Sequence, residues 1–337
     1  MPIAKDIRAA SRKLTARGPG EYTEWSENGD AMHASIGALA ALGTAFAWTL
    51  TAICFEYAAK RIGALTLNFL RLLVGSLFLG IYGLLARGRF APIDAPPSAW
   101  LWLGASGLVG FVLGDLCLFQ AFIDIGSRLS MLVYATAPVF TALLGFAVFG
   151  ERLTPLGAGG ILLTLAGIAF VVLSRRETSS PESPPRDLPR RARGLVLAVV
   201  AALGQAGGLV LGKLGAGSGI GAMDPFAGTQ VRVIAGILGF AVVITASRNW
   251  RGVGSGLRDG KAAASLTAGA FFGPFIGVSL SLLAVQSGNV GIASAIMSIV
   301  PVLIIAPSAL FLKERVTLRE ILGSVIAVAG VFALFLA

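Results

Sequence analysis

Long apolar runs dominate the sequence from Ser35 to its last residue, and short polar segments separate them. The runs are about 18–25 residues long, and a helix of about 20 apolar residues crosses a hydrocarbon core of roughly 30 Å. The expected spans cover 35–56, 66–85, 100–123, 130–149, 156–173, 194–214, 227–246, 263–286, 291–311 and 319–337. The predicted fold is therefore an all-α polytopic membrane protein with ten transmembrane helices.

One polar segment is longer than the other loops and divides the chain. Residues 174–193 read SRRETSSPESPPRDLPRRAR, and this richness in Pro, Ser and Arg predicts a linker. The linker separates a five-helix unit at 35–173 from a second unit at 194–337. Residues 1–34 are polar and basic and lack the apolar core of a signal peptide. We expect a disordered tail there, with the first membrane helix as an uncleaved targeting signal.

The two units carry matching motifs. The stretch APVFTALLGFAVFGERLTP in the first resembles VPVLIIAPSALFLKERVTL in the second. Pro138 and Glu151 correspond to Pro301 and Glu314, each 163 residues later. Further matches pair Asn68, Arg71 and Gly75 with Thr229, Arg232 and Gly236, and Gly110 and Gly114 with Gly273 and Gly277. This agreement predicts duplication of a five-helix unit.

An odd number of helices per unit has a physical consequence. The second unit must enter the membrane from the opposite side, so the units are predicted to be inverted repeats. A pseudo-two-fold axis in the membrane plane would relate them. This arrangement is typical of secondary transporters, with the substrate site near the midplane between the repeats. The glycine spacing in 110–114 and 269–277 also predicts close approach of helix backbones.

The matching motifs have local explanations. Pro138 and Pro301 are expected to interrupt the fourth helix of each unit and to act as gates or hinges, because proline removes a backbone hydrogen bond. Glu151 and Glu314 are expected to mark the points where these helices leave the bilayer, as boundary and loop anchors.

Composition supports a membrane protein and limits its chemistry. The chain is 55% hydrophobic and 13% charged, and its net charge of +10 lies mostly in loops and tails. That charge fits membrane anchoring and orientation, so nucleic acid is not an expected partner. The single histidine and two cysteines offer no metal site and no nucleophile pair, and no cofactor is expected. No ATP-hydrolysing domain is recognisable, so transport would be driven by a gradient or be passive.

Ionisable and polar groups inside apolar spans are the candidate functional residues, because burying them in a bilayer is costly. Asp115 is the leading candidate. It is suited to take up a proton or to hold an amino group, and a structural ion pair is the alternative. Arg71 and Arg232 match between the units, which favours a packing or interface role, and both are expected near helix ends. The remaining candidates to line a cavity are Trp48, Gln120, Tyr134, Gln205 and Gln286.

These features resemble the drug/metabolite transporter superfamily, specifically the EamA-type ten-helix exporters. The resemblance rests on the two five-helix units, on Arg71 and Arg232 in their second helices, and on the Pro…(Gly or Lys)-Glu-Arg ending of the fourth helices. It covers 35–337 apart from the linker. It implies solute export by alternating access, a central cavity walled by both units, and cytoplasmic termini. Members move amino acids, nucleosides, other metabolites or drugs.

Loop charges give conflicting orientations. With the N-terminus inside, Arg87 and Arg89 fit the positive-inside rule, whereas Arg248 and Arg251 would lie outside. We follow the first unit, because the first helix usually sets orientation. The expected location is the plasma (bacterial inner) membrane, with both termini cytoplasmic.

The predicted function is a secondary transporter that exports small metabolites, such as amino acids or related compounds, or drugs. The alternatives are an exchanger of nucleotide-sugar or phosphorylated metabolites, a passive channel and a membrane-embedded enzyme; an enzyme is not expected. Anionic cargo would require basic residues in the cavity. The expected partners are a small-molecule substrate and the lipid bilayer, and both a monomer and a homodimer remain open.

Overall fold

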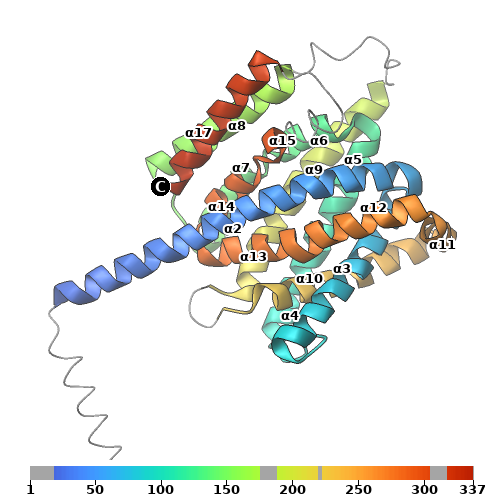
Figure 1. The fold of residues 1–337 in the computed structure, drawn as a ribbon, viewed down its shortest axis with the longest axis horizontal. Coiled ribbons are helices and arrows are strands. Elements are labelled where there is room, and N and C mark those ends of the chain that lie inside the picture. The colour runs from blue at the N-terminus through green and yellow to red at the C-terminus, as the bar shows by residue number, and fades with distance from the viewer. Residues whose placement is uncertain (1–18, 175–187, 219–221, 304–316, 337) are drawn as a thin grey trace, which may run out of the picture.

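The computed structural model describes residues 19–174, 188–218, 222–303 and 317–336, and every regular element in these ranges is a helix (Figure 1). The first unit comprises α2 (Pro19–Ile62), α3 (Ala64–Arg87), α4 (Pro97–Gly107), η1 (Leu108–Asp115), α5 (Leu116–Ile125), α6 (Ser127–Tyr134), α7 (Ala137–Phe149) and α8 (Pro155–Ser174). The second comprises α9 (Leu188–Ala216), α10 (Pro225–Ala246), α11 (Trp250–Arg258), α12 (Gly260–Ala270), η3 (Phe271–Gly277), α13 (Val278–Ser287), α14 (Val290–Met297), α15 (Val300–Leu303) and α17 (Leu318–Phe335).

Among the described residues, six helical stretches are long and apolar enough to cross a membrane. They are Ser35–Ile62, Ala64–Arg87, Pro97–Ile125, Pro189–Ala216, Pro225–Ala246 and Gly260–Ser287. Four shorter apolar helices occupy the other predicted positions, at Ala137–Phe149, Pro155–Phe170, Val290–Leu303 and Ile321–Phe335. The all-helical multi-pass fold is confirmed, whereas the count of ten spans stays a prediction.

The first helix begins earlier than the hydropathy pattern suggests. The sequence predicts a disordered tail at 1–34, whereas the structure assigns 19–34 to the first turns of α2. Pro19 suits the first turn of a helix, and no proline follows it before the apolar span begins at Ser35. The helix can therefore run without a break into the span. Residues 1–18 lie outside the described ranges.

The third helix of each unit changes its winding at the same place. It runs as α4–η1–α5 in the first unit and as α12–η3–α13 in the second. The two η segments are π-helical and begin at Leu108 and Phe271, 163 residues apart. Short π-helical segments disturb the regular backbone ladder and are frequent at functional sites. The sequence repeat is therefore also a repeat of backbone geometry.

The two units pack against each other through corresponding helices. The first helix of each unit lies on the third helix of the other: α2 contacts α12, η3 and α13, while α9 contacts α4, η1 and α5. The second, fourth and fifth helices pair with their counterparts, α3 with α10, α7 with α14 and α8 with α17. Figure 1 shows α8 and α17 side by side along one edge of the molecule.

Paired counterparts run antiparallel. Gly160 near the start of α8 lies against Gly330 near the end of α17, and Gly167 lies against Gly323. A two-fold axis perpendicular to the helices produces this relation, which is the one expected of inverted repeats.

The fourth helix of each unit is interrupted just before its proline. Residues 135–136 separate α6 from α7, and residues 298–299 separate α14 from α15. Pro138 and Pro301 are each the second residue of the new segment, where their missing N–H leaves no hydrogen bond unmade. The predicted interruption is present in both units. The hinge role stays a prediction.

Glycines bring α9 into backbone contact with η1. A Cβ added at Gly204 would lie 2.7 Å from the Cα of Gly114, and one added at Gly208 would lie 3.1 Å from the Cα of Gly110. The predicted close approach of backbones at 110–114 is therefore confirmed, and a Cβ at Gly204 would fit only if a backbone moved.

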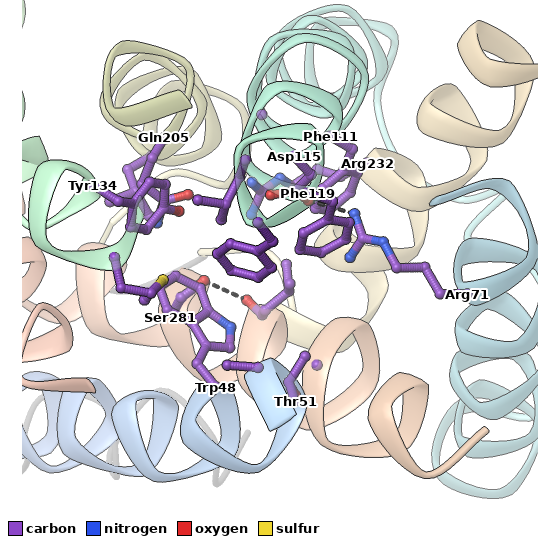
Figure 2. A pocket seen from close by; sticks show the side chains of 18 residues that line it. Trp48, Thr51, Arg71, Phe111, Asp115, Phe119, Tyr134, Gln205, Arg232 and Ser281 are labelled. Atoms are coloured by element: carbon purple, nitrogen blue, oxygen red, sulfur yellow. Dashed lines mark hydrogen bonds and ion pairs between the residues drawn. The ribbon is translucent and has the colours of Figure 1, made fainter. Parts of the chain in front are cut away.

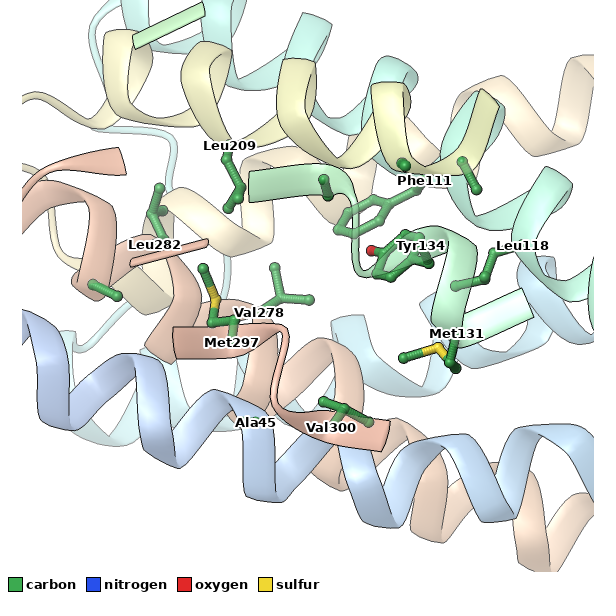
Figure 3. Close-up of a cluster of buried hydrophobic side chains, with 14 of the residues drawn as sticks. Ala45, Phe111, Leu118, Met131, Tyr134, Leu209, Val278, Leu282, Met297 and Val300 are labelled. Atoms are coloured by element: carbon green, nitrogen blue, oxygen red, sulfur yellow. The ribbon is translucent and has the colours of Figure 1, made fainter. Parts of the chain in front are cut away.

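The hydrophobic core lies between the units (Figure 3). It combines buried side chains of both, such as Phe111 and Leu118 of the first with Leu209, Leu282 and Met297 of the second. Such a core places side chains from distant parts of the chain around one central point, and that point holds a cavity.

Candidate functional site

A cavity of about 70 Å³ lies between the units, with room for a few water molecules (Figure 2). Trp48, Asp115 and Gln205 line it from near the middle of three of the long spans. The cavity is therefore far from the ends of these helices. Its lining residues with polar side-chain groups are Trp48, Thr51, Arg71, Asp115, Tyr134, Gln205, Arg232 and Ser281.

An ion pair between Arg71 and Asp115 lies inside the cavity. Arg71 projects from α3, and its Nη2 donates to Oδ2 of Asp115, the last residue of η1. The Nε of Arg71 donates to Oδ1 of Asn68 at 3.0 Å. The Arg71 side chain is 4% exposed and that of Asp115 18%. The Phe55 and Phe119 rings lie 5.5 and 5.0 Å from the Arg71 Cζ. Both charges are thus buried and each has a partner, as buried ions require.

Arg232 reaches the same cavity from α10 without an equivalent partner. The residue is 3% exposed, and its Cζ lies 5.2 Å from the centre of the Phe111 ring. Its Nε and Nη1 have no hydrogen-bond partner in the described structure. Figure 2 shows Arg232 near Asp115, on which Arg71 converges from α3. The described ionisable groups with a full charge around the cavity are two guanidinium groups and one carboxylate, a net charge of one positive unit.

Aromatic and apolar side chains complete the wall. Phe111, Phe119 and Phe122 come from the third helix, Tyr134 from α6 and Trp48 from α2. The Phe119 and Phe122 rings contact each other with centres 5.5 Å apart. Such a wall suits the apolar body of a small solute, while the few polar groups fix its orientation.

A smaller hollow of about 10 Å³ extends toward the helix interruptions. It shares Trp48, Tyr134 and Gln205 with the main cavity and reaches Ala135 and Ser298. Irregular backbone at membrane depth is tolerated where it lines a cavity or is covered by protein. The interruptions of both fourth helices therefore border the candidate site.

Four of the six predicted lining residues meet in the cavity: Trp48, Asp115, Tyr134 and Gln205. Gln286 does not line the cavity. It lies at the end of α13, whereas Val278 at the start of that helix lines the cavity, and its Nε2 donates to the Met223 carbonyl at 2.8 Å. The prediction that Gln286 lines the cavity is corrected accordingly.

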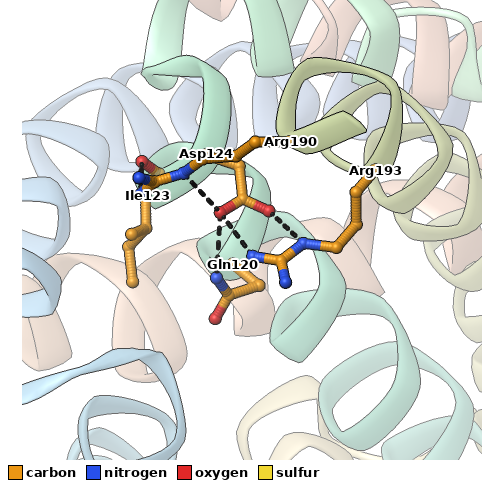
Figure 4. Close-up of polar contacts among 5 residues, drawn as sticks. All are labelled: Gln120, Ile123, Asp124, Arg190 and Arg193. Carbon is orange, nitrogen blue, oxygen red and sulfur yellow. Dashed lines mark hydrogen bonds and ion pairs between the residues drawn. The ribbon is translucent and has the colours of Figure 1, made fainter. Parts of the chain in front are cut away.

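Gln120 also lies outside the cavity lining. Its Nε2 donates to Oδ1 of Asp124, one helical turn further along α5, at 3.2 Å (Figure 4). The fully buried Asp124 carboxylate also accepts two hydrogen bonds of 2.8 Å from Arg193 and pairs with Arg190 at 3.5 Å. Gln120 thus belongs to a cluster that fastens the start of α9 to the end of α5, and its prediction as a lining residue is corrected.

The sequence predicts that Arg71 and Arg232 lie near helix ends in a packing or interface role, and the structure shows that both also reach the cavity. Arg71 of α3 and Arg232 of α10 each contact the third helix of the first unit, and both line the cavity. The available signal was a charged residue repeated within an apolar span of each unit. Phe111, Phe119 and Ser281 were not predicted, since nothing in the sequence distinguishes them from other buried residues.

Glu151 connects the two units. Its Oε1 accepts from Lys213 Nζ at 2.6 Å, and its Oε2 accepts from the Val290 N–H at 2.9 Å. Lys213 Nζ also donates to the Gly288 carbonyl at 2.6 Å. These contacts tie the end of α7 to the end of α9 and the start of α14. The corresponding Glu314 lies outside the described residues.

Replacing Lys213 by methionine is expected to destabilise the protein by about 1–3 kcal/mol, because the largely buried Glu151 loses a charged donor. Thermal unfolding of the purified protein measures this. Lys60→Met is the matched control, since the Lys60 side chain is 58% exposed and its pair with Glu56 lies within one helix. Equal shifts in the two variants would contradict a structural role for the Lys213 contact.

Comparisons with known proteins agree with the repeats. The model of the EamA-like transporter family matches residues 35–173 and again 192–336. A solved protein crystal structure is 18% identical over 89% of this chain and 96% of that one, with a TM-score of 0.64, which shows a shared fold. No curated protein matches the chain. The resemblance noted in the sequence is confirmed, and this multi-pass membrane protein belongs to the EamA-like transporter family.

Proposed function

We propose that the protein is a secondary transporter that exports small metabolites or drugs by alternating access. One observation carries this proposal: a charged, aromatic cavity lies at mid-span between two antiparallel units, and both units build its wall. A relative movement of such units would turn the cavity from one side of the bilayer to the other. We place the protein in the plasma (bacterial inner) membrane with both termini in the cytoplasm.

The interruptions of the fourth helices are the proposed hinges. At each interruption the backbone hydrogen bonding passes through a short turn. The Val139 N–H donates to the Thr136 carbonyl at 3.1 Å, and the Val302 N–H donates to the Ile299 carbonyl at 2.9 Å. Because the regular backbone hydrogen bonding is interrupted there, the two segments can change their angle more easily than parts of a continuous helix. Because these turns border the smaller hollow, bending there would alter the cavity directly.

The two ends of α9 are the proposed closures. Arg193 holds the first end to Asp124 of α5, and Lys213 holds the other to Glu151 after α7. Alternating access requires that one side opens while the other stays closed. We propose that the two ion pairs break in different states of the cycle.

Counterflow in liposomes tests the transport proposal. Purified protein is reconstituted, loaded with one unlabelled solute at a time, and exposed to the labelled form of that solute, with amino acids, nucleosides, organic anions and organic cations as the panel. We expect saturable exchange of one class and no exchange in protein-free liposomes. An ion leak without exchange would overturn the carrier proposal in favour of a passive channel.

A further inference from the structure

The first unit contains a complete polar network around its arginine. Arg71 donates from Nε to Asn68, three residues earlier on α3, and from Nη2 to the carboxylate of Asp115. Asn68 also donates from Nδ2 to the Ala64 carbonyl at 3.0 Å. Each member of this network is buried or nearly so, and each has a partner.

The second unit contains counterparts of two members of this network but not of the third. Thr229 and Arg232 take the positions of the asparagine and the arginine, but Val278 stands 163 residues after Asp115, where the carboxylate would be. The Thr229 Oγ1 and the Arg232 Nε and Nη1 are buried without hydrogen-bond partners in the described structure. Val278 lines the cavity, as Asp115 does.

A buried guanidinium with two unpaired donor atoms is costly, and a ligand that pairs with it would remove that cost. The fork of the arginine side chain matches the two oxygens of a carboxylate. We infer that the transported solute carries a carboxylate, which binds Arg232 in the place that Asp115 occupies in the first unit. This inference rests on the proposed transport function and specifies its substrate class.

The net charge of the cavity favours a solute that carries a single negative charge. Arg71 and Asp115 neutralise each other, so one carboxylate on Arg232 makes the occupied cavity neutral. A phosphate monoester, with nearly two negative charges, would leave an excess charge in a buried site. The phenyl rings and Trp48 around the cavity suit an apolar body. The solute is therefore a small monocarboxylate with an apolar side.

Ligand-dependent thermal unfolding of the purified full-length protein tests this inference. The probes are phenylacetate, phenylacetamide and phenyl phosphate at matched sodium chloride. We expect phenylacetate to raise the Tm with increasing concentration, because it binds the folded state, and the isosteric amide to leave the Tm unchanged. Equal responses to the acid and the amide, including no response to either, would overturn the inference. A response to phenyl phosphate alone would overturn it as well.

Three variants locate the effect. In Arg232→Gln the phenylacetate affinity should fall about tenfold or more, whereas Arg258→Gln, at an exposed residue on α11, should keep the response. Val278→Asp supplies the missing carboxylate within the chain, so the apo protein should unfold at the same or a higher temperature and phenylacetate should no longer stabilise it. An undiminished phenylacetate response in Val278→Asp would overturn the assignment to Arg232. Counterflow of neutral solutes without any preference for acids would overturn the inference of a carboxylate substrate, but it would leave the proposed transport function intact.

Discussion

Replacing Arg71 by methionine is expected to destabilise the protein by about 3–5 kcal/mol, because the Asp115 carboxylate would remain in the cavity without its partner. The Arg71 side chain is 4% exposed and enclosed by aromatic rings, so water cannot easily replace it. Thermal unfolding of the purified protein in detergent measures the loss. A change below about 1 kcal/mol would show that the pair does not hold a buried charge.

A second variant separates the charge from the packing. Arg71→Met combined with Asp115→Leu removes both charges, and replacing a buried ion pair by apolar side chains is often neutral. We therefore expect the double variant to recover most of the stability lost in Arg71→Met. Arg87→Met is the matched control from the same helix, since Arg87 pairs at 2.7 Å with the more exposed Asp94 outside the spans. Its effect should be small, because exposed ion pairs contribute little.

The exposed Arg87–Asp94 pair also affects the protonation of the Asp94 carboxyl. The hydrogen bond from Arg87 holds the pKa of the Asp94 carboxyl below its ordinary value. The small stabilisation that results is present at neutral pH and is lost as the pH falls through the lowered pKa. The Arg71–Asp115 pair differs from this exposed pair, because both of its charges lie in the cavity.

The helices and their repetition could be predicted because the bilayer restricts what can cross it. Spans must be apolar and about 20 residues long, and offsets of 161 to 163 residues identify their counterparts. The cavity was predicted only in part, because position along a helix does not reveal which neighbour crosses it. Arg71 lies near the start of α3, yet the third helix passes at that level and brings Asp115 to it.

The asymmetry between the units needed both the sequence and the structure. The alignment alone pairs Asp115 with Val278, a difference without evident meaning in an apolar span. The packing shows that Arg232 lines the same cavity as Val278 and has unpaired donor atoms. Gln120 is the opposite case, because its neighbour one turn away, Asp124, was visible in the sequence and binds it.

The crossing of α9 and η1 gives the second large expected effect. Gly204→Ala should destabilise the protein by about 1–3 kcal/mol, because the new Cβ would lie 2.7 Å from the Gly114 Cα and 3.1 Å from the Val109 carbonyl oxygen. Both obstacles are backbone, so no side chain can rotate to make room. The helices must separate, and the cavity wall formed by η1 would move with them.

Gly159→Ala on α8 is the matched control, with the opposite sign expected. A Cβ at Gly159 meets no atom within 4 Å, so the gain in helix propensity, about 1 kcal/mol, should raise the stability slightly. Gly208→Ala should fall between the two, since its Cβ would lie 3.1 Å from the Gly110 Cα. Thermal unfolding of the three variants would give this order if backbone contact sets the distance between α9 and η1. Equal shifts at Gly204 and Gly159 would mean that the crossing has room for a methyl group and that the glycines are not what positions η1 against the cavity.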